Sequence, residues 1–502
     1  MPISRREFLA TTVAASLSPA AVSALAAPGR SLGDGGEIAQ ASATELARAI
    51  RDGALSSVEV VEACLGRIDS LNDKLNAVVH LDREGAIAAA RRADKALAGG
   101  KNLGALHGVP ITIKDSYDTA GMVSTGGTQG RAGFIPAADA TVVARLKAAG
   151  AIVLGKTNTP ELTLSLETDN VVYGRTVNPY DLARSPGGSS GGAAAAIAAG
   201  LSVLDVGSDT GASVRYPAHC CGITGLKPTH GRVPRTGHII SFAGVTESLT
   251  TLGPLARRVE DLELVFRLIA GPDAIDPFVT PAPLGDPSAI RLQGLRAAVY
   301  TDIDQVTASE ATAKTIGSAS DALRDAGVSI EMATPPRLIE SLDIFLGLFA
   351  GDGGEGLRGF LDMLGTTELS PQMIAALKVM KEGAMSTAEY QGLVMNLDLW
   401  RSELLGFMDQ YDVLICPVSA NPAPESLTTW ETREDILSPD LFAYTAPFNL
   451  TGWPVAVVRA GTAPGDLPVG VQVVARPWRE DVALAVAAHL ENTLGGFVPP
   501  VL

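Results

Sequence analysis

Two serines stand at opposite ends of a glycine-rich stretch between residues 185 and 217, and serine hydroxyls can act as nucleophiles. Ser189 lies in the run SPGGSSGG, and Ser213 lies in the later run GSDTGAS. The residues between the two runs predict an alanine-rich helix and a short apolar strand, so each serine stands at a turn. A serine in such a turn can attack a carbonyl group or help to bind an anion, and both chemistries are open at this point.

Two well-known glycine and serine motifs do not match this stretch. The serine of a Ser-His-Asp hydrolase normally stands in a G-x-S-x-G elbow, which the sequence around Ser213 lacks. The run from Gly187 to Gly192 precedes a helix, but no Lys-Ser or Lys-Thr pair follows it, as a nucleotide-hydrolysing P-loop requires. The six histidines and four cysteines have no metal-ligand spacing. We therefore expect no metal and no other cofactor.

A lysine could supply the base that a nucleophilic serine needs. Lys114 ends the run PITIK and is followed by Asp115. The pattern alone favours an ion pair between these two side chains, or a lysine that reaches solvent. Burial at the end of a strand would instead lower the lysine pKa from about 10.4 toward 7, so that the neutral amine could accept a proton. Backbone N–H groups could then form an oxyanion hole, contributed by Thr210, Gly211, Ala212 and Ser213.

The runs GVPITIKD, SPGGSSGGAAAAIAAG and GSDTGASVRYPA, in this order, resemble the amidase signature family. The resemblance extends to LGKTN, GLKPTHGRVPRTG, GPLARRVEDLE, FNLTGWPVAVV and LPVGVQVV. It implies that Ser213 is the nucleophile, that Ser189, after a cis peptide bond, relays the proton, and that Lys114 is the base. This implication replaces the ion pair that the local pattern favours for Lys114. The family commonly has glycine at position 212, so Ala212 predicts an ordinary φ or a compensating contact there.

Several neighbours are expected to support these three side chains. The glycines before Ser189 allow a close approach of the backbone. Ser190 either bonds within the triad or stabilises a turn, and Tyr173 either lines the pocket or packs in the core. Asp209 and Arg215 are most simply a buried structural ion pair. The supporting set is Gly187, Gly188, Ser190, Asp209 and Arg215.

The resemblance also implies the fold, a single three-layer α/β/α domain around a large twisted mixed β-sheet, over residues 41–500. Ser42 and Ser56 each begin a capping box, which predicts two N-terminal helices. The run GPLARRVEDLELVFRLIAG predicts a helix with Pro254 in its first turn, and GITGLKPTHGRVPRTG predicts a loop. Residues 338–408 read as helices interrupted near Gly351, and they form either a substrate cap or core packing.

The N-terminus predicts export. Arg5 and Arg6 form a twin-arginine pattern, an apolar stretch follows, and Ala24-Leu25-Ala26 is a small-residue cleavage site. Residues 1–26 are therefore predicted to be a twin-arginine signal peptide and residues 27–40 a linker. The expected product is periplasmic, without stable membrane insertion after cleavage. The cysteines are expected to be buried free thiols.

Composition limits the partners. The formal net charge of −16, with no basic run, argues against nucleic acid, whose binding needs clustered Lys and Arg. The resemblance implies a hydrolase that cleaves a carboxamide through an acyl-enzyme, and we expect a monomer or homodimer. The apolar residues over 338–408 indicate that the substrate is an uncharged aryl or aliphatic amide. Carbamate or ester hydrolysis by the same triad is the nearest alternative. A component of a tRNA-dependent amidotransferase and a non-catalytic anion-binding protein remain more distant alternatives.

Overall fold

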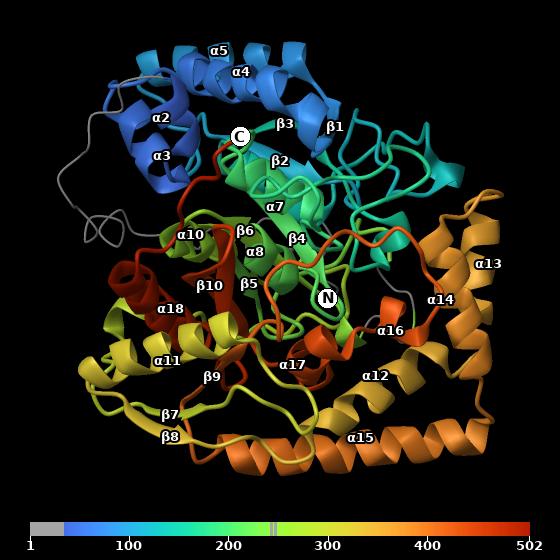
Figure 1. Ribbon diagram of the computed structural model, residues 1–502. Helices are drawn as coiled ribbons and strands as arrows, with labels where there is room; N and C mark the ends of the chain where they lie inside the picture. The colour runs from blue at the N-terminus through green and yellow to red at the C-terminus, as the bar shows by residue number, and fades with distance from the viewer. Residues whose placement is uncertain (1–34, 241–243, 245–247) are drawn as a thin grey trace, which may run out of the picture. The chain divides into compact units, whose positions relative to one another are not determined.

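The glycine-rich stretch folds as predicted into a loop, a helix, a strand and a turn. The structure is a computed structural model and describes residues 35–240, residue 244 and residues 248–502 (Figure 1). Helix α7 (Gly191–Ala198) follows the serine loop and strand β4 (Leu204–Asp209) leads to Ser213. Every residue of α7 is buried, because its alanines and glycines are apolar on all sides and let neighbouring elements approach closely.

The larger sheet has eight strands in the described part of the chain, in the order β4-β6-β5-β10-β11-β9-β7-β8. Neighbouring strands from β4 to β9 are antiparallel, whereas β9, β7 and β8 run parallel, so the sheet is mixed as predicted. Besides β4, its strands are β5 (Thr224–Lys227), β6 (Thr251–Ala256), β7 (Arg296–Val299), β8 (Ser329–Met332), β9 (Val413–Pro417), β10 (Val455–Ala463) and β11 (Leu467–Ala475).

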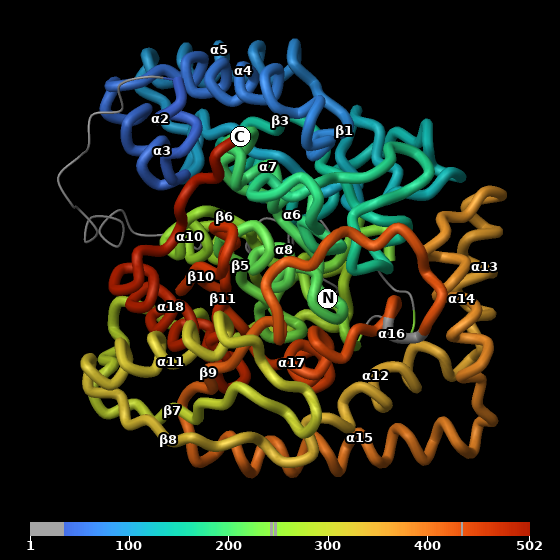
Figure 2. Tube along the Cα trace, in the orientation of Figure 1, coloured from blue at the N-terminus to red at the C-terminus, as the bar shows by residue number. Residues whose placement is uncertain are grey.

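Helices cover both faces of this sheet, which confirms the predicted α/β architecture (Figures 1 and 2). Helix α18 (Glu480–Leu494) contacts both α10 (Val259–Ile269) and α11 (Glu310–Asp325), and α11 and α18 pack on β10 and β11. Helix α8 (Arg215–Cys220) packs on β5, β10 and β11 together with α7, which lies on β4 and β6. The turn at residues 210–213, which we call the nucleophile turn because Ser213 is its predicted nucleophile, thus connects strand β4 to the buried helix α8.

A smaller sheet, β1-β3-β2, carries Lys114. It consists of β1 (Val78–Leu81), β2 (Pro110–Lys114) and β3 (Ile152–Thr157), and β2 and β3 are parallel. Strand β2 contacts β4 but belongs to a different sheet from β4. The lysine and the nucleophile turn are therefore supplied by two sheets that meet at the β2 and β4 edges.

The N-terminal layer matches its capping signals. Ser42 caps α3 (Ala43–Arg51) and Ser56 caps α4 (Ser57–Leu75), each in a complete capping box. The prediction of a linker over residues 27–40 is wrong for residues 35–40. These residues form helix α2 (Gly35–Gln40), which packs on α4 and buries Ile38 and Ala39. The predicted signal peptide lies outside the described residues.

Residues 338–408 are helical, as predicted, with a break at Gly351–Gly354. Helix α12 packs on α17, which belongs to the C-terminal part of the chain, and on α14 and α15. In Figure 2, α13, α14 and α15 extend beyond the larger sheet at one side. The helices are α12 (Ser341–Ala350), α13 (Glu355–Met363), α14 (Pro371–Glu382), α15 (Thr387–Met408) and α17 (Pro439–Leu450).

Two local predictions were wrong around β5 and β6. Pro254 lies within strand β6, opposite Val206 of β4, instead of in the first turn of a helix. The pairing of β5 with β6 stops at Gly225 opposite Leu255. Pro254, which has no N–H to donate, is the next residue and lies just beyond the end of this pairing. The run GITGLK contains strand β5, because its turn residues begin only after Lys227.

The remaining elements are short or peripheral, with the exception of α5. They are α5 (Arg83–Ala98), η2 (Gln129–Arg131), α6 (Thr141–Ala148), η3 (Glu161–Thr163), η4 (Pro287–Ala289), η5 (Leu338–Glu340) and α16 (Arg433–Ile436). None of the helices in the described ranges has both the length and the apolar character needed to cross a membrane. Residues Gly35–Leu502 form one compact unit.

Candidate active site

Lys114 is fully buried and its ammonium group is surrounded by serine hydroxyls. Its Nζ donates to Ser189 Oγ at 2.7 Å, to Ser190 Oγ at 3.0 Å and to Ser208 Oγ at 3.0 Å. These three bonds use all three N–H groups of a protonated lysine. The same hydroxyls could donate to the lone pair of a neutral lysine, so the arrangement suits proton exchange.

Burial lowers the pKa of Lys114 to about 7, since the charged form loses its hydration. The carboxylates of Asp205 and Asp209 act in the opposite direction and raise this pKa. Asp115 does not pair with Lys114, in contrast to the interpretation of the local pattern. It accepts hydrogen bonds from Thr125 and from the Gly126 N–H.

The serine before α7 has an unusual backbone. The peptide bond between Gly188 and Ser189 is cis, which is the geometry that the resemblance implies. A β-carbon at Gly188 would lie 2.6 Å from backbone atoms of Ser165 and Leu166, so no larger residue fits. Gly187 takes a φ of +77°, which favours glycine. The loop therefore needs both glycines to bring Ser189 onto Lys114.

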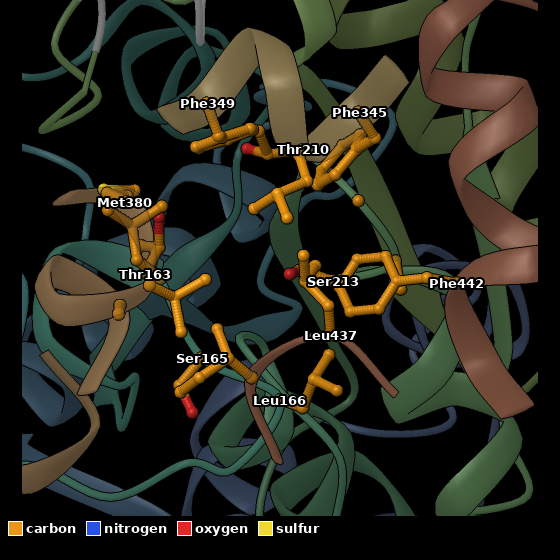
Figure 3. A pocket seen from close by; sticks show the side chains of 17 residues that line it. Thr163, Ser165, Leu166, Thr210, Ser213, Phe345, Phe349, Met380, Leu437 and Phe442 are labelled. Carbon is orange, nitrogen blue, oxygen red and sulfur yellow. The ribbon is translucent and has the colours of Figure 1, made fainter. Parts of the chain in front are cut away.

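Ser213 lies on the turn after β4 and faces a cavity of about 90 Å³ (Figure 3). The Asp209 carboxylate accepts hydrogen bonds from the N–H groups of Val214 and Arg215. The four residues before Val214 also line the cavity, and among the described residues none accepts a hydrogen bond from their backbone N–H groups. These groups belong to Thr210, Gly211, Ala212 and Ser213, the residues predicted to form the oxyanion hole.

The turn is held by the buried ion pair that the sequence predicts. Arg215 Nη2 lies 2.9 Å from Asp209 Oδ1, and both side chains are 0% exposed. Arg215 also donates to the Thr445 carbonyl at 2.9 Å and to Gln472 Oε1 at 3.0 Å. The guanidinium thus joins the turn to α17 and β11, and its hydrogen bonds compensate for its burial.

Ala212 takes a negative φ, so alanine fits where the family commonly has glycine. Gly211 is different, because a β-carbon there would lie 2.6 Å from the ring of Phe442 and 3.1 Å from that of Phe345. The aromatic wall of the cavity therefore approaches the turn at Gly211.

Two residues near Lys114 were missed by the sequence reasoning. Ser208, one position before Asp209, is the third acceptor of the lysine. Asp205 accepts hydrogen bonds from the Lys114 backbone N–H at 2.9 Å and from Thr112 Oγ1 at 2.7 Å. The sequence signal for Asp205 was an aspartate within an otherwise apolar predicted strand, since a buried carboxylate must accept hydrogen bonds or pair with a cation. Tyr173 is not among the described residues that line the cavity.

The His, Cys, Asp and Glu side chains of the described residues are the candidate metal ligands. In the ranges that the structure describes, no group of three or more His, Cys, Asp or Glu side chains has the arrangement of a metal site. All four cysteines are buried free thiols, as predicted. Burial raises the pKa of the Cys64 and Cys416 thiols to about 12, so these two sulfurs stay protonated at neutral pH.

Known proteins with similar sequences and folds share this architecture. The Amidase family matches residues 59–484. An indoleacetamide hydrolase of Bradyrhizobium diazoefficiens is 35% identical over 485 residues, which cover 92% of this chain and 88% of the relative. One subunit of the glutamyl-tRNA(Gln) amidotransferase of Salinispora arenicola is 35% identical over 500 residues, which cover 93% of this chain and 100% of the relative.

A solved structure of an amidase has a fold similar to that of this chain. The native peptide amidase from Stenotrophomonas maltophilia superimposes with a TM-score of 0.78 at 28% identity, covering 92% of this chain and 98% of that one. The fold and the similarities together define a hydrolase that acts on carbon–nitrogen bonds. The chain belongs to the amidase family, also called the amidase signature family.

Proposed function

We propose that this amidase hydrolyses uncharged aryl or aliphatic carboxamides through an acyl-enzyme on Ser213. The cavity at Ser213 carries this proposal, because its wall consists mainly of Leu, Phe, Ile, Val and Met side chains. Among the described residues that line it, none is charged. A charged substrate would lose hydration there without gaining a partner. The relative from Bradyrhizobium diazoefficiens is an indoleacetamide hydrolase, and indoleacetamide is an uncharged aromatic amide.

The proposed reaction begins with a proton transfer to Lys114. With a pKa of about 7, a large fraction of this lysine is neutral at neutral pH. Ser189 gives its proton to Lys114 and takes the proton of Ser213, whose Oγ attacks the carbonyl carbon. The N–H groups of the turn at residues 210–213 stabilise the negative oxygen, each for about 3 kcal/mol.

The reverse proton path completes the reaction. Lys114 returns the proton through Ser189 to the leaving nitrogen, the C–N bond breaks, and the acyl group remains as an ester on Ser213. Water then attacks this ester and loses its proton by the same route, which releases the carboxylate and restores the three side chains. The same steps would cleave a carbamate or an aryl ester, so these are the alternative substrates.

A role within an amidotransferase is the alternative that the relative from Salinispora arenicola supports. The two functions differ in whether the chain needs a partner. A purified chain that turns over aryl amides by itself has a complete hydrolytic site, whereas activity that appears only with a co-purifying protein supports the amidotransferase function.

The test is a substrate panel with two matched serine variants. We expect Ser213→Ala to lower kcat/KM for anilides at least about a thousandfold and to abolish labelling by a fluorophosphonate probe, without unfolding. Ser165→Ala also changes a serine of the cavity wall, but Ser165 makes no bond to Lys114, so it should retain turnover within a few-fold. Substantial anilide hydrolysis by Ser213→Ala, or a preference for small charged amides, would contradict the proposal.

A further inference from the structure

A second cavity lies beside the one at Ser213, and the two share part of their walls. We call them the outer cavity and the inner cavity. The outer cavity has a volume of about 710 Å³, compared with about 90 Å³ for the inner one. Leu164, Phe349 and Met380 line both. Figure 3 shows Phe349 and Met380 on the part of the inner wall that lies across from Phe442.

The inner cavity is too small to hold a large substrate by itself. Cavities that enclose small organic ligands have volumes of roughly 300 to 1,000 Å³. The outer cavity falls in this range and the inner one does not. A long substituent that extends from Ser213 past the three shared residues would enter the outer cavity.

A row of phenylalanine rings marks this route. The ring centroids of Phe442 and Phe345 are 5.5 Å apart, and those of Phe345 and Phe349 are 5.0 Å apart. Phe442 and Phe345 line the inner cavity, and Phe349 lines both cavities. An apolar substituent would thus contact aromatic surface continuously from the nucleophile turn to the outer cavity.

The lining of the outer cavity favours an uncharged occupant. Most of its apolar side chains come from the helical region, from α12, α13, α14 and the start of α15, with Leu357 and Phe360 of α13 among them. Among the described residues of this lining, Asp352 is the one that carries a charge, and both of its carboxylate oxygens accept hydrogen bonds. They accept the backbone N–H groups of Gly354 at 2.7 Å and Gly356 at 2.8 Å, which fixes the start of α13.

We infer that the outer cavity is a substrate subsite for the distal end of an extended, uncharged, apolar substituent of the amide. Leu164, Phe349 and Met380 form the neck that this substituent passes. The inference rests on the proposed function, because it assigns the substituent to an amide whose carbonyl reacts at Ser213. It gives the helices over residues 338–408 the role of building the distal half of the substrate site.

The experiment compares substituents of different length on the full-length enzyme. One series is acetyl, hexanoyl and dodecanoyl 4-nitroanilide, and a second series has an acetyl group on amines of matched lengths. Each methylene that enters a cavity should raise kcat/KM about threefold to fourfold in one of the two series. The series that responds identifies the side of the amide that occupies the outer cavity.

Two variants alter the outer cavity by different means. Phe360→Ser removes apolar surface, and Thr387→Trp fills space from the first residue of α15. Because the two substitutions act differently, a folding defect in one variant leaves the other variant to test the inference. Each should lower kcat/KM for the longest responsive substrate about tenfold or more and leave the acetyl anilide within twofold. Met363→Ser is the control, since Met363 lies on α13, is 71% exposed and lines neither cavity.

The outcomes separate this inference from the proposed function. The inference is overturned if neither series responds to length, or if the outer-cavity variants lower short and long substrates by the same factor. Turnover of the acetyl anilide and its loss in Ser213→Ala report on the reaction itself, so they can hold while the subsite fails. A terminal ammonium or carboxylate on the long chain should lower kcat/KM, and equal turnover of charged and uncharged chains would also overturn the inference.

Discussion

Gly211 and Ala212 are neighbours on the nucleophile turn, yet they tolerate a side chain very differently. The backbone of Ala212 has an ordinary φ, and its methyl group is accommodated at 1% exposure. Gly211 instead faces the rings of Phe345 and Phe442. The usual glycine of the family at position 212 is therefore dispensable here, whereas the glycine at position 211 is required by the aromatic wall.

This difference predicts opposite outcomes for two single-methyl changes. Gly211→Ala should lower kcat/KM for anilides at least tenfold and the free energy of unfolding by about 1 to 3 kcal/mol, because the rings or the turn must move. Ala212→Gly should change activity less than threefold. Chemical denaturation and steady-state kinetics on both variants check the prediction, and wild-type behaviour of Gly211→Ala would contradict the described packing.

Strands β2 and β4 meet through side chains at the point where the two sheets adjoin. Asp205 of β4 accepts hydrogen bonds from the backbone of Lys114 and from Thr112, both on β2, and from Thr157 Oγ1 on β3 at 2.9 Å. Burial raises the pKa of Asp205 to about 6, so the carboxylate is still mostly ionised at neutral pH. It thus positions Lys114 and also raises the lysine pKa.

Removal of that charge should therefore shift the pH profile. In the wild type, kcat/KM should fall as the pH drops below about 7, because Lys114 becomes protonated. In Asp205→Asn this acidic limb should move to lower pH, since the charge that favours the ammonium is gone. Asp115→Asn is the matched control, because that buried carboxylate bonds to Thr125 instead of Lys114. A limb that stays in place in Asp205→Asn, with only the maximal rate reduced, would indicate a purely structural role.

The helices over residues 338–408 join the rest of the enzyme through a large apolar cluster. Trp400 of α15 is 0% exposed and donates its indole N–H to the Arg337 carbonyl at 2.9 Å. Its cluster also contains Phe345 of α12 and Phe442 of α17, which line the inner cavity. The residues that stabilise the helical region therefore belong to the same apolar cluster as residues that line the inner cavity.

The N-terminal pattern leads to a prediction for the whole chain in the cell. We propose that the protein is exported through the twin-arginine route, on the basis of Arg5, Arg6 and the Ala24-Leu25-Ala26 run. Replacement of both arginines by lysine should leave uncleaved protein in the cytoplasm and remove amidase activity from the periplasmic fraction. Immunoblots of cell fractions measure both effects, and equal periplasmic activity of the variant and the wild type would contradict the proposal.

The amino-acid sequence by itself was sufficient for the family, for most helices and strands, and for the placement of Ser189 and Ser190 beside Lys114. These features depend on local order along the chain, namely capping residues, apolar periodicity and three short motifs in a fixed succession. The buried pair of Asp209 and Arg215 was also predictable, since opposite charges beside an apolar strand must compensate each other. Strand β6 was missed because a proline in an apolar run is ambiguous until the neighbouring strand is known.

The tertiary structure decided everything that depends on residues distant in sequence. The packing of β2 against β4 shows that Ser208 joins Ser189 and Ser190 at the Lys114 Nζ and that Asp205 accepts the Lys114 backbone N–H. The aromatic wall at Gly211 consists of Phe345 from α12 and Phe442 from α17, and the outer cavity forms where α12, α13, α14 and α15 come together. No motif encodes such contacts, because cavity shape and desolvation are set by which elements pack together.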